Sequence, residues 1–243
     1  KQVPALEYNP FEAVKTNIVG SQNVIEAALD NEVERVLLVS TDKAAQPINL
    51  YGATKLCAEK IFISANAYSN FNNTKFSVVR YGNVLGSRGS IIETLLKNRG
   101  AKKVNITHPD MTRFWLKLED SFELVMFGLK NMEGGEIFIP KVPSMKITDL
   151  FDVLAPDAKK EITGIRPGEK IHEILITESE SKNAIELNKY FVILPSIIFK
   201  DNLFKKYEKG KKLTQDFRFT SDTNKTWLTK EKFSEIVQKL KIA

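Results

Sequence analysis

The stretch LLVSTDKAAQPINLYGATK, residues 37–55, joins the end of an apolar run to a group of polar and titratable side chains. The run itself, RVLLVS at residues 35–40, is short, continuous and rich in β-branched residues, which is typical of a parallel strand covered on both faces. A helix is predicted from about Leu50 to about Tyr68. The stretch therefore predicts a buried strand that leads through a polar loop into a helix.

The segments on either side repeat this alternation. Asn9, Pro10 and Glu12 fit an N-cap, a proline in the first helical position and a capping-box acid, and the apolar spacing continues that helix to about Asn31. The sequence KFSVVRYGNV predicts another strand at residues 76–81. Helix and strand in alternation predict an α/β fold with a doubly wound, Rossmann-like parallel sheet, whose ligands bind beyond the carboxyl ends of the strands.

The alternation weakens beyond residue 90. A helix is predicted over residues 119–132 and a strand over residues 136–140. A short helix is predicted from Ile147, with Thr148 as its cap. RPGEK at residues 166–170 predicts a turn-rich loop, and this part of the chain is expected to be a smaller, substrate-binding region.

Three consecutive regions are predicted: part of a Rossmann-like dinucleotide-binding domain at 1–90, a mainly substrate-binding region with a returning strand at 91–200, and an appendix at 201–243. The chain reaches its first helix almost at once and contains no G-x-G-x-x-G loop to seat a pyrophosphate. We therefore expect a sheet that lacks its first strands, and an N-terminally truncated chain that is inactive in isolation.

The composition suits a globular core, with 42% hydrophobic residues in 243. The formal net charge of +6 comes mostly from lysines scattered among acids, which predicts a solvated surface and no nucleic-acid partner. Cys57 is the only cysteine, and no apolar stretch of about 20 residues is present, so neither an intrachain disulfide nor a membrane segment is expected. These features predict a protein of the cytoplasm.

Tyr51 and Lys55 are four residues apart, and on a helix they share one face. A tyrosine acts as a base near neutral pH only if its phenolate is stabilised by about 4 kcal/mol, and a lysine ammonium one turn away supplies part of that. Tyr207 and Lys211 have the same spacing but follow no predicted strand, so a structural role is predicted for that pair.

The strand-end hydroxyls, the YxxxK helix and RYGNVLGSRGS at residues 80–90 resemble the extended short-chain dehydrogenase/reductase family. Within that family, STDKAAQPINLYGATK at 40–55, MTRFW at 111–115 and IRPGEK at 165–170 resemble the inverting UDP-N-acetylglucosamine 4,6-dehydratases, polysaccharide biosynthesis proteins that begin pseudaminic acid synthesis. Related retaining dehydratases tend to have methionine at the position of Tyr51, so the tyrosine favours the inverting branch.

The resemblance implies an NADP-dependent dehydration with a catalytic set of five residues. Tyr51, with Lys55 and Thr41, takes the proton of the C4 hydroxyl while hydride passes from C4 to NADP. Lys43 as a neutral amine removes the C5 proton, and Asp42 as an acid assists loss of the C6 hydroxyl. Hydride then returns to C6 and C5 is reprotonated from the opposite face, which gives a UDP-4-keto-6-deoxy-L-hexosamine for surface or flagellar glycans. Burial favours the protonated acid and the neutral amine, whereas an exposed ion pair contributes less than about 1 kcal/mol.

The resemblance also implies contacts with the cofactor and the UDP-sugar. The expected cofactor contacts are Tyr51, Lys55, Asn83 and Val84. The expected sugar-nucleotide contacts are Lys1, Asn83, Arg113, Arg166 and Glu169. Guanidinium groups bind diphosphates in bidentate fashion, and a carboxylate accepts hydrogen bonds from ribose hydroxyls. A homo-oligomer is implied, and no metal.

Two alternatives remain open from the sequence. A nucleotide-sugar 4-epimerase would use Tyr51 and Lys55 but would give no role to Asp42 and Lys43. A non-catalytic relative would bind sugar nucleotides or partner chains without turnover. NADP is expected from the resemblance, although the glycine loop that distinguishes NADP from NAD is absent from the sequence.

Overall fold

The computed structural model describes residues 3–68, 73–98, 100–196 and 203–240. The chain forms two compact units, and it passes between them several times. The first unit consists of Lys1–Tyr81, Phe122–Lys141 and Ile174–Phe219. The second unit consists of Gly82–Ser121, Val142–Glu173 and Thr220–Ala243. The consecutive regions predicted from the sequence do not coincide with these units, because hydrophobic periodicity shows which face of an element is buried but not which core the element joins.

The first unit contains most of the regular structure. Its helical segments are α1 (Val3–Tyr8), α2 (Pro10–Val14), a π-helical turn (Lys15–Val19), α3 (Gly20–Asp30), a 3₁₀ turn (Asp42–Ala44), α4 (Leu50–Ala65), most of α6 (Leu118–Asn131), α8 (Glu178–Ser181) and α9 (Leu203–Tyr207). Its strands are β1 (Arg35–Thr41), β2 (Lys75–Tyr81), β6 (Ile137–Pro140), β9 (Ile174–Ile176), β10 (Ala184–Glu186), β11 (Tyr190–Ile193) and β12 (Lys211–Lys212). The short strand β13 (Phe219–Thr220) lies where the chain leaves this unit.

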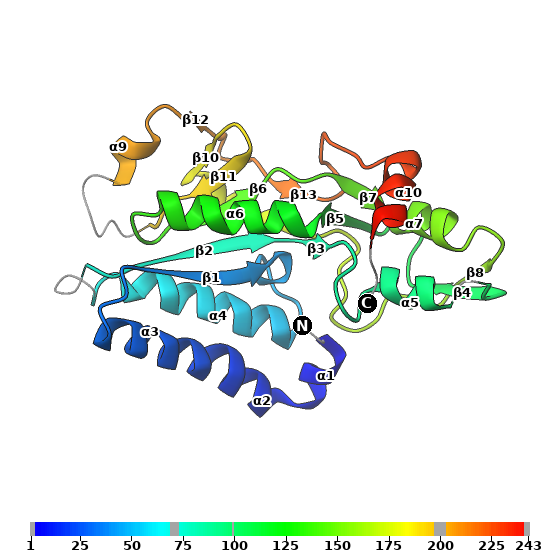
Figure 1. Ribbon diagram of the computed structural model, residues 1–243, viewed down its shortest axis with the longest axis horizontal. Helices are drawn as coiled ribbons and strands as arrows, with labels where there is room; N and C mark the ends of the chain where they lie inside the picture. The colour runs from blue at the N-terminus through cyan, green and yellow to red at the C-terminus, as the bar shows by residue number, and fades with distance from the viewer. Residues whose placement is uncertain (1–2, 69–72, 99, 197–202, 241–243) are drawn as a thin grey trace. The chain divides into compact units, whose positions relative to one another are not determined.

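The central sheet has the strand order β1-β2-β6-β11-β10-β12. β1, β2 and β6 run parallel, with Val39 opposite Val79 and Val79 opposite Phe138, and the remaining strands are antiparallel to their neighbours. Figure 1 shows α3 and α4 on one face of β1 and β2, and α6 on the other face. The predicted α/β fold with a parallel central sheet covered by helices on both faces is confirmed.

Close packing of α6 on the sheet depends on Gly128. A Cβ atom at this position would lie 3.1 Å from Leu37 and 3.3 Å from Val79. The helix therefore approaches β1 and β2 more closely than a residue with a side chain allows without displacing them. On β2, Phe76, Val78 and Val79 are fully buried, as expected of a strand covered on both faces.

One predicted helix cap lacks its hydrogen bond, and another is wrong. The helix from Pro10 continues to Asp30 as predicted and Asn9 is its N-cap residue, but the Asn9 side chain makes no capping hydrogen bond, because α1 precedes it and its amide donates to the Ala5 carbonyl at 2.7 Å. The helix at Ile147 begins directly after β7, so the residue before its first turn is Lys146 and not Thr148.

The segment after residue 200 does not form an appendix in the described part of the chain. Lys211–Lys212 (β12) pairs with β10 and extends the central sheet. The helix α10 (Lys230–Lys239) buries Phe233 and Val237 in the core of the second unit. In the sequence, aromatic residues spaced among lysines are typical of a solvated tail. In the structure, Phe233 packs in the core of the second unit.

The second unit contains two small sheets and three helices among its described residues. A three-stranded sheet has the order β3-β5-β7 and a two-stranded sheet pairs β4 with β8. Its elements are β3 (Asn83–Val84), α5 (Ile91–Lys97), β4 (Lys103–Ile106), β5 (Thr112–Leu116), β7 (Ser144–Lys146), α7 (Ile147–Leu154), β8 (Lys159–Ile162) and α10. Trp115, Met145 and Phe151 lie in its core. Within the described ranges of both units, no helix has the length and apolar character needed to span a bilayer.

Candidate functional site

The predicted catalytic residues of the first unit gather at the carboxyl end of β1. Thr41 is the last residue of the strand, and the 3₁₀ turn begins at Asp42. The Thr41 hydroxyl accepts a hydrogen bond from the Lys43 backbone N–H at 3.4 Å and donates one to Asp42 Oδ1 at 2.9 Å. Asn49 caps α4 by accepting from the Gly52 N–H at 2.7 Å. Local capping therefore fixes both the turn and the start of the helix.

Asp42 and Lys43 form a partly buried ion pair. Lys43 Nζ lies 3.1 Å from Asp42 Oδ1, and the two side chains are 1% and 25% exposed. A surface pair of two solvated side chains is therefore not what the structure shows. The Asp42 carboxyl group is withdrawn from water and lies beside an amine. This is the environment expected for an acid and a base that must exchange protons.

Tyr51 lies in the first turn of α4, beside this pair. Burial raises the pKa of the Tyr51 phenol above its ordinary value, and the positive charge of Lys43 and a side-chain hydrogen bond with Thr41 oppose that rise. The negative charge of Asp42 and the neighbouring Tyr81 raise the pKa further. The residues of the unit alone therefore hold Tyr51 as a phenol, and additional positive charge is needed to make it a base.

Lys55 lies on the same face of α4 as Tyr51, but its ammonium donates to the Val39 carbonyl at 2.6 Å. Burial lowers the pKa of Lys55, and the charge of Glu59 opposes this effect. The positive charge of Lys43 also acts on the Tyr51 phenol. Helical spacing does not indicate this cation, because Lys43 lies on the preceding turn and not on α4. The influence of Lys55 on the phenol stays a prediction.

Gly52 explains how α4 approaches the 3₁₀ turn. A Cβ atom at position 52 would overlap the Lys43 carbonyl oxygen and would lie 3.1 Å from Pro47 Cβ. No other residue type leaves room for that backbone contact. The glycine between Tyr51 and the rest of the helix therefore sets the distance between the phenol and the acid–amine pair.

Several residues that support this site were not singled out from the sequence. Asn17, in the π-helical turn, donates to Thr54 Oγ1 at 3.0 Å, and π-helical turns are frequent at functional sites. Ser40 donates to Glu59 at 2.5 Å, so only Thr41 of the two strand-end hydroxyls faces Tyr51. Glu59 follows Lys55 by four residues, and this helical spacing was the feature of the sequence that could have indicated that Glu59 lies on the same helix face.

Arg113 in the second unit is buried, and its N–H groups already have partners. Nη1 donates to the carbonyls of Thr112 and Ile171, and Nη2 donates to the Lys170 carbonyl and contacts the Met111 sulfur. Nε lies 3.6 Å from a Glu173 carboxylate oxygen. Arg113 thus holds the end of the RPGEK loop in place, and its contact with a diphosphate stays a prediction.

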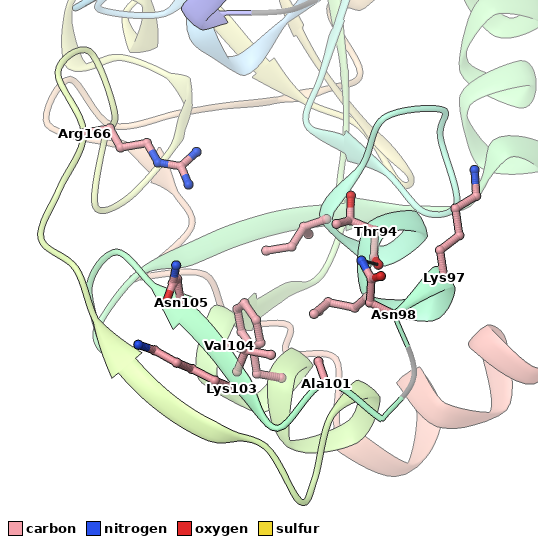
Figure 2. A pocket seen from close by; sticks show the side chains of 11 residues that line it. Thr94, Lys97, Asn98, Ala101, Lys103, Val104, Asn105 and Arg166 are labelled. Carbon is pink, nitrogen blue, oxygen red and sulfur yellow. Dashed lines mark hydrogen bonds between the residues drawn. The ribbon is translucent and has the colours of Figure 1, made fainter.

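Arg166 lines a cavity of about 580 Å³ in the second unit. Figure 2 shows its side chain extending from the loop on one side, with Thr94 and Asn98 of the α5 region on the other. Lys97 and Lys103 also line the cavity. Glu169 accepts from the Arg166 backbone N–H at 3.3 Å, so the two residues belong to one turn of the loop.

The other predicted contacts belong to the second unit or lie outside the described residues. Asn83 and Val84 form β3 in the second unit, where they pair with Trp115 and Leu116 of β5. Both are partly exposed, and their contact with a cofactor or substrate stays a prediction. Lys1 lies outside the described residues.

Comparison with known proteins adds an independent line of evidence. Residues 1–195 match the model of a family described as "Polysaccharide biosynthesis protein". The chain belongs to this family. The resemblance predicted from the strand-end and loop motifs is thereby confirmed for the family, and the match covers the whole strand-end site and the RPGEK loop of this polysaccharide biosynthesis protein.

Curated relatives and solved structures agree with the family match. A UDP-N-acetylglucosamine 4,6-dehydratase (inverting) from Campylobacter jejuni is 49% identical over 98% of this chain and 73% of its own length. A UDP-glucose 4-epimerase from Rickettsia canadensis is 38% identical over 79% of this chain and 58% of its own. The crystal structure of Pen from Bacillus thuringiensis superimposes with a TM-score of 0.87 at 36% identity, over 100% of this chain and 73% of that one. This polysaccharide biosynthesis protein is therefore similar both to dehydratases and to epimerases.

Proposed function

We propose that this chain carries the catalytic residues of an inverting UDP-N-acetylglucosamine 4,6-dehydratase. The observation that carries the proposal is the buried Asp42 carboxyl in contact with Lys43, next to Tyr51 and Thr41. An acid and an amine side by side are what elimination of water between C5 and C6 of a hexose requires. The similarity to a dehydratase over almost the full chain supports the same conclusion.

At C4, the reaction begins with removal of a hydroxyl proton. Tyr51 is the base, and Thr41 orients the hydroxyl of the sugar. Once Asp42 is protonated, the Thr41 hydroxyl can turn from Asp42 and donate to the phenolate, which stabilises it. A nicotinamide cofactor in its oxidised form, held beside Tyr51 and Lys55, would supply positive charge near the phenol and the hydride-transfer chemistry between C4 and C6. The ketone that forms at C4 makes the C5 hydrogen acidic.

At C5 and C6, Asp42 and Lys43 act as one unit. Lys43, as a neutral amine, takes the C5 proton, and Asp42, as an acid, gives a proton to the leaving C6 hydroxyl, which departs as water. In the resting site the two groups form an ion pair, so one proton first passes from the Lys43 ammonium to the Asp42 carboxylate across the 3.1 Å contact. From that neutral acid and neutral amine, the elimination gives carboxylate and ammonium again, so the net charge of the pair does not change. C5 then takes a proton from solvent on the opposite face, and Tyr51 releases the proton of the C4 hydroxyl to solvent.

The residues present fit the reactive end of a nicotinamide cofactor. Tyr51 and Lys55 lie at the carboxyl end of the parallel strand β1, where ligands of doubly wound sheets bind. The sequence has no G-x-G-x-x-G loop for the pyrophosphate. We propose NADP as the cofactor on the resemblance alone, and we expect the isolated chain to show little activity.

The cavity in the second unit is suited to a nucleoside diphosphate. Arg166 lines the cavity together with Lys97 and Lys103, whose ammonium groups are paired with Glu93 and Glu161. Asn98 and Asn105 contribute amide groups that can pair with a base edge. A UDP group carries negative charge on its diphosphate, so the cavity and the ligand are complementary. We propose that this cavity holds the UDP moiety, with Arg166 directed at the phosphates.

The alternative with a specific observation behind it is a 4-epimerase, because epimerases are among the relatives. An epimerase returns hydride to C4 and leaves Asp42 and Lys43 without a function. The test is the mass of the product that the complete gene product forms from UDP-N-acetylglucosamine with NADP. Loss of one water supports the dehydratase, an isomer of unchanged mass supports the epimerase, and binding without turnover supports the non-catalytic relative.

Other parts of the prediction rest on the resemblance or on the composition of the chain. A homo-oligomeric assembly, a cytoplasmic location, the absence of a nucleic-acid partner and a role in surface or flagellar glycans through the pseudaminic acid pathway stay predictions. Size-exclusion chromatography with light scattering tests the first of them, and a monomer at micromolar concentration would contradict it.

A further inference from the structure

The first unit contains a buried ion triad behind the strand-end site. Arg80 on β2 is fully buried, and its guanidinium binds two carboxylates. Nε and Nη2 donate to Glu59 at 3.0 and 2.6 Å, and Nη1 and Nη2 donate to Glu180 at 3.1 and 2.9 Å. Nη1 also donates to the Leu175 carbonyl at 3.0 Å. All five N–H groups of the guanidinium therefore have acceptors.

Glu59 connects this triad to the catalytic residues. It lies on α4, four residues after Lys55 and eight after Tyr51, and therefore on the same helix face. Its Oε1 atom accepts a hydrogen bond from Ser40 as well as from Arg80. Ser40 and Arg80 are directly opposite each other in the β1–β2 register, so one carboxylate of α4 binds a pair of neighbouring residues on the two strands.

Stability alone is a weak explanation for this arrangement. Two carboxylates share one guanidinium in a buried site, and the cost of taking such charges out of water often equals or exceeds their mutual attraction. Apolar residues of similar volume give comparable stability in many proteins. The triad contributes fixed geometry, because its bidentate contacts set the position of helix α4 relative to strands β1 and β2.

We propose that Glu59 is a positioning residue, which through Ser40 and Arg80 holds Tyr51 and Lys55 in register with the end of β1. The inference rests on the proposed function only in its use of turnover as a readout. Ser40 is followed directly by Thr41, so the same carboxylate sets both the helix that carries the phenol and the strand end that carries its hydrogen-bond partner. The charge of Glu59, which also acts on the pKa of Lys55, supports this role.

The test compares two buried serines that each donate to a buried glutamate. Ser40 donates to Glu59, and Ser77 on β2 donates to Glu136 at 2.7 Å, away from the phenol. Ser40→Ala lowers kcat about tenfold and leaves KM within about twofold, because a small misplacement of the base affects the chemical step and not binding. Ser77→Ala lowers the melting temperature to a similar extent but leaves kcat within about twofold.

A second variant separates positioning from general weakening of the fold. Glu59→Gln also lowers kcat, and the double variant Ser40→Ala/Glu59→Gln loses no more than Glu59→Gln alone, because both changes break one linkage. Additive losses, or equal kcat values for Ser40→Ala and Ser77→Ala, overturn the proposal. If Glu59→Gln does not fold, the comparison of the two serine variants decides the question.

A readout without turnover keeps this proposal distinct from the proposed function. Hydrogen exchange of the amides of residues 50–59, followed by mass spectrometry, is faster in Ser40→Ala than in Ser77→Ala if Glu59 holds the helix through Ser40. Equal exchange in the two variants counts against positioning. A wild-type protein that forms an isomer, or no product, contradicts the dehydratase proposal and leaves this comparison intact.

Discussion

Lys43 Nζ lies 3.1 Å from Asp42 Oδ1, and the Asp42 side chain is only 1% exposed. Two consecutive residues with opposite charge are common on protein surfaces, but a carboxyl group withdrawn from water beside an amine is not. The contact lets the pair exchange a proton without a change in net charge. In the proposed mechanism, this relationship distinguishes a site for elimination of water from one that only moves hydride at C4.

Substitution of Asp42 and substitution of Lys43 are expected to impair the reaction in different ways. Asp42→Asn lowers formation of the dehydrated product by about 10²–10⁴-fold, but Lys43 still removes the C5 proton, so recovered sugar gains deuterium at C5 in D₂O. Lys43→Met abolishes both the formation of the dehydrated product and the uptake of deuterium at C5. Nuclear magnetic resonance of the recovered sugar measures the label. Equal loss of C5 exchange in the two variants would contradict the assigned roles.

Tyr51→Phe is expected to lower kcat by about 10²–10⁴-fold, because the base at C4 is removed. Tyr207→Phe is the matched control, since Tyr207 has the same spacing to a lysine but is buried with its hydroxyl 3.1 Å from Glu136. Its loss costs about 1 kcal/mol of unfolding free energy, because Glu136 keeps other donors, and kcat does not change. A similar fall of kcat in both variants would contradict the assignment of Tyr51 as the base at C4.

The pH dependence of Thr41→Val follows from the hydrogen bond between Thr41 and the Tyr51 phenol. This bond lowers the pKa of Tyr51, so its removal raises that pKa, and the active phenolate forms only at higher pH. The ascending limb of the kcat profile therefore moves up by about one pH unit, and lost activity returns as pH rises.

Thr74→Val is the control for that change. Thr74 is fully buried, and its hydroxyl has no hydrogen-bond partner among the described residues. The substitution is expected to leave the profile in place and to stabilise the fold slightly, because it removes a buried polar group that lacks a partner. A Thr41→Val profile that falls uniformly, without recovery at alkaline pH, would contradict the role of the hydroxyl.

Gly52→Ala is expected to displace α4 from the 3₁₀ turn, because its Cβ atom overlaps the Lys43 carbonyl. We expect a loss of roughly 1–3 kcal/mol of stability and a larger relative loss of kcat. Gly20→Ala, in helix α3, meets only an ordinary contact at 3.5 Å and is expected to stabilise the protein by about 0.5–1 kcal/mol. Unfolding curves and kcat for both variants check this, and a Gly52→Ala protein with full activity refutes it.

Arg166→Gln is expected to weaken UDP binding about tenfold or more without changing the melting temperature, because a charge-assisted contact with phosphate is lost. Arg113→Lys is expected to lower the melting temperature, since a lysine cannot replace the contacts that Arg113 makes with the carbonyls of Lys170 and Ile171. Calorimetric titration with UDP measures the first effect and thermal unfolding the second. Unchanged UDP affinity in Arg166→Gln would contradict the proposal that this cavity holds the UDP moiety.

The sequence predicted the parts of the fold that depend on local pattern. The strand at Arg35–Thr41 and the helix from Leu50 followed from a continuous apolar run and a polar loop, and both are present. The tail was not predicted, because Phe233 and Val237 find their core only through contact with distant segments of the second unit. Periodicity carries no information about such pairings.

The site was predictable only in part, for the same reason. Thr41, Asp42, Lys43 and Tyr51 are close in sequence, and they meet in space. The charge of Lys43 on the phenol was not predicted, because helical spacing was the only geometry that the sequence supplied and it indicated Lys55. Arg80 and Glu59 were missed, since their contact spans 21 positions and joins a strand to a helix.

The most direct test of the central claim follows the C5 position of the sugar. The complete gene product, with UDP-N-acetylglucosamine and NADP in D₂O, is expected to give a product that has lost one water, carries deuterium at C5 and has the opposite configuration at that carbon. Lys43→Met is expected to give none of it. A wild-type product that keeps its mass and its original hydrogen at C5 would contradict the claim that Asp42 and Lys43 act on the sugar.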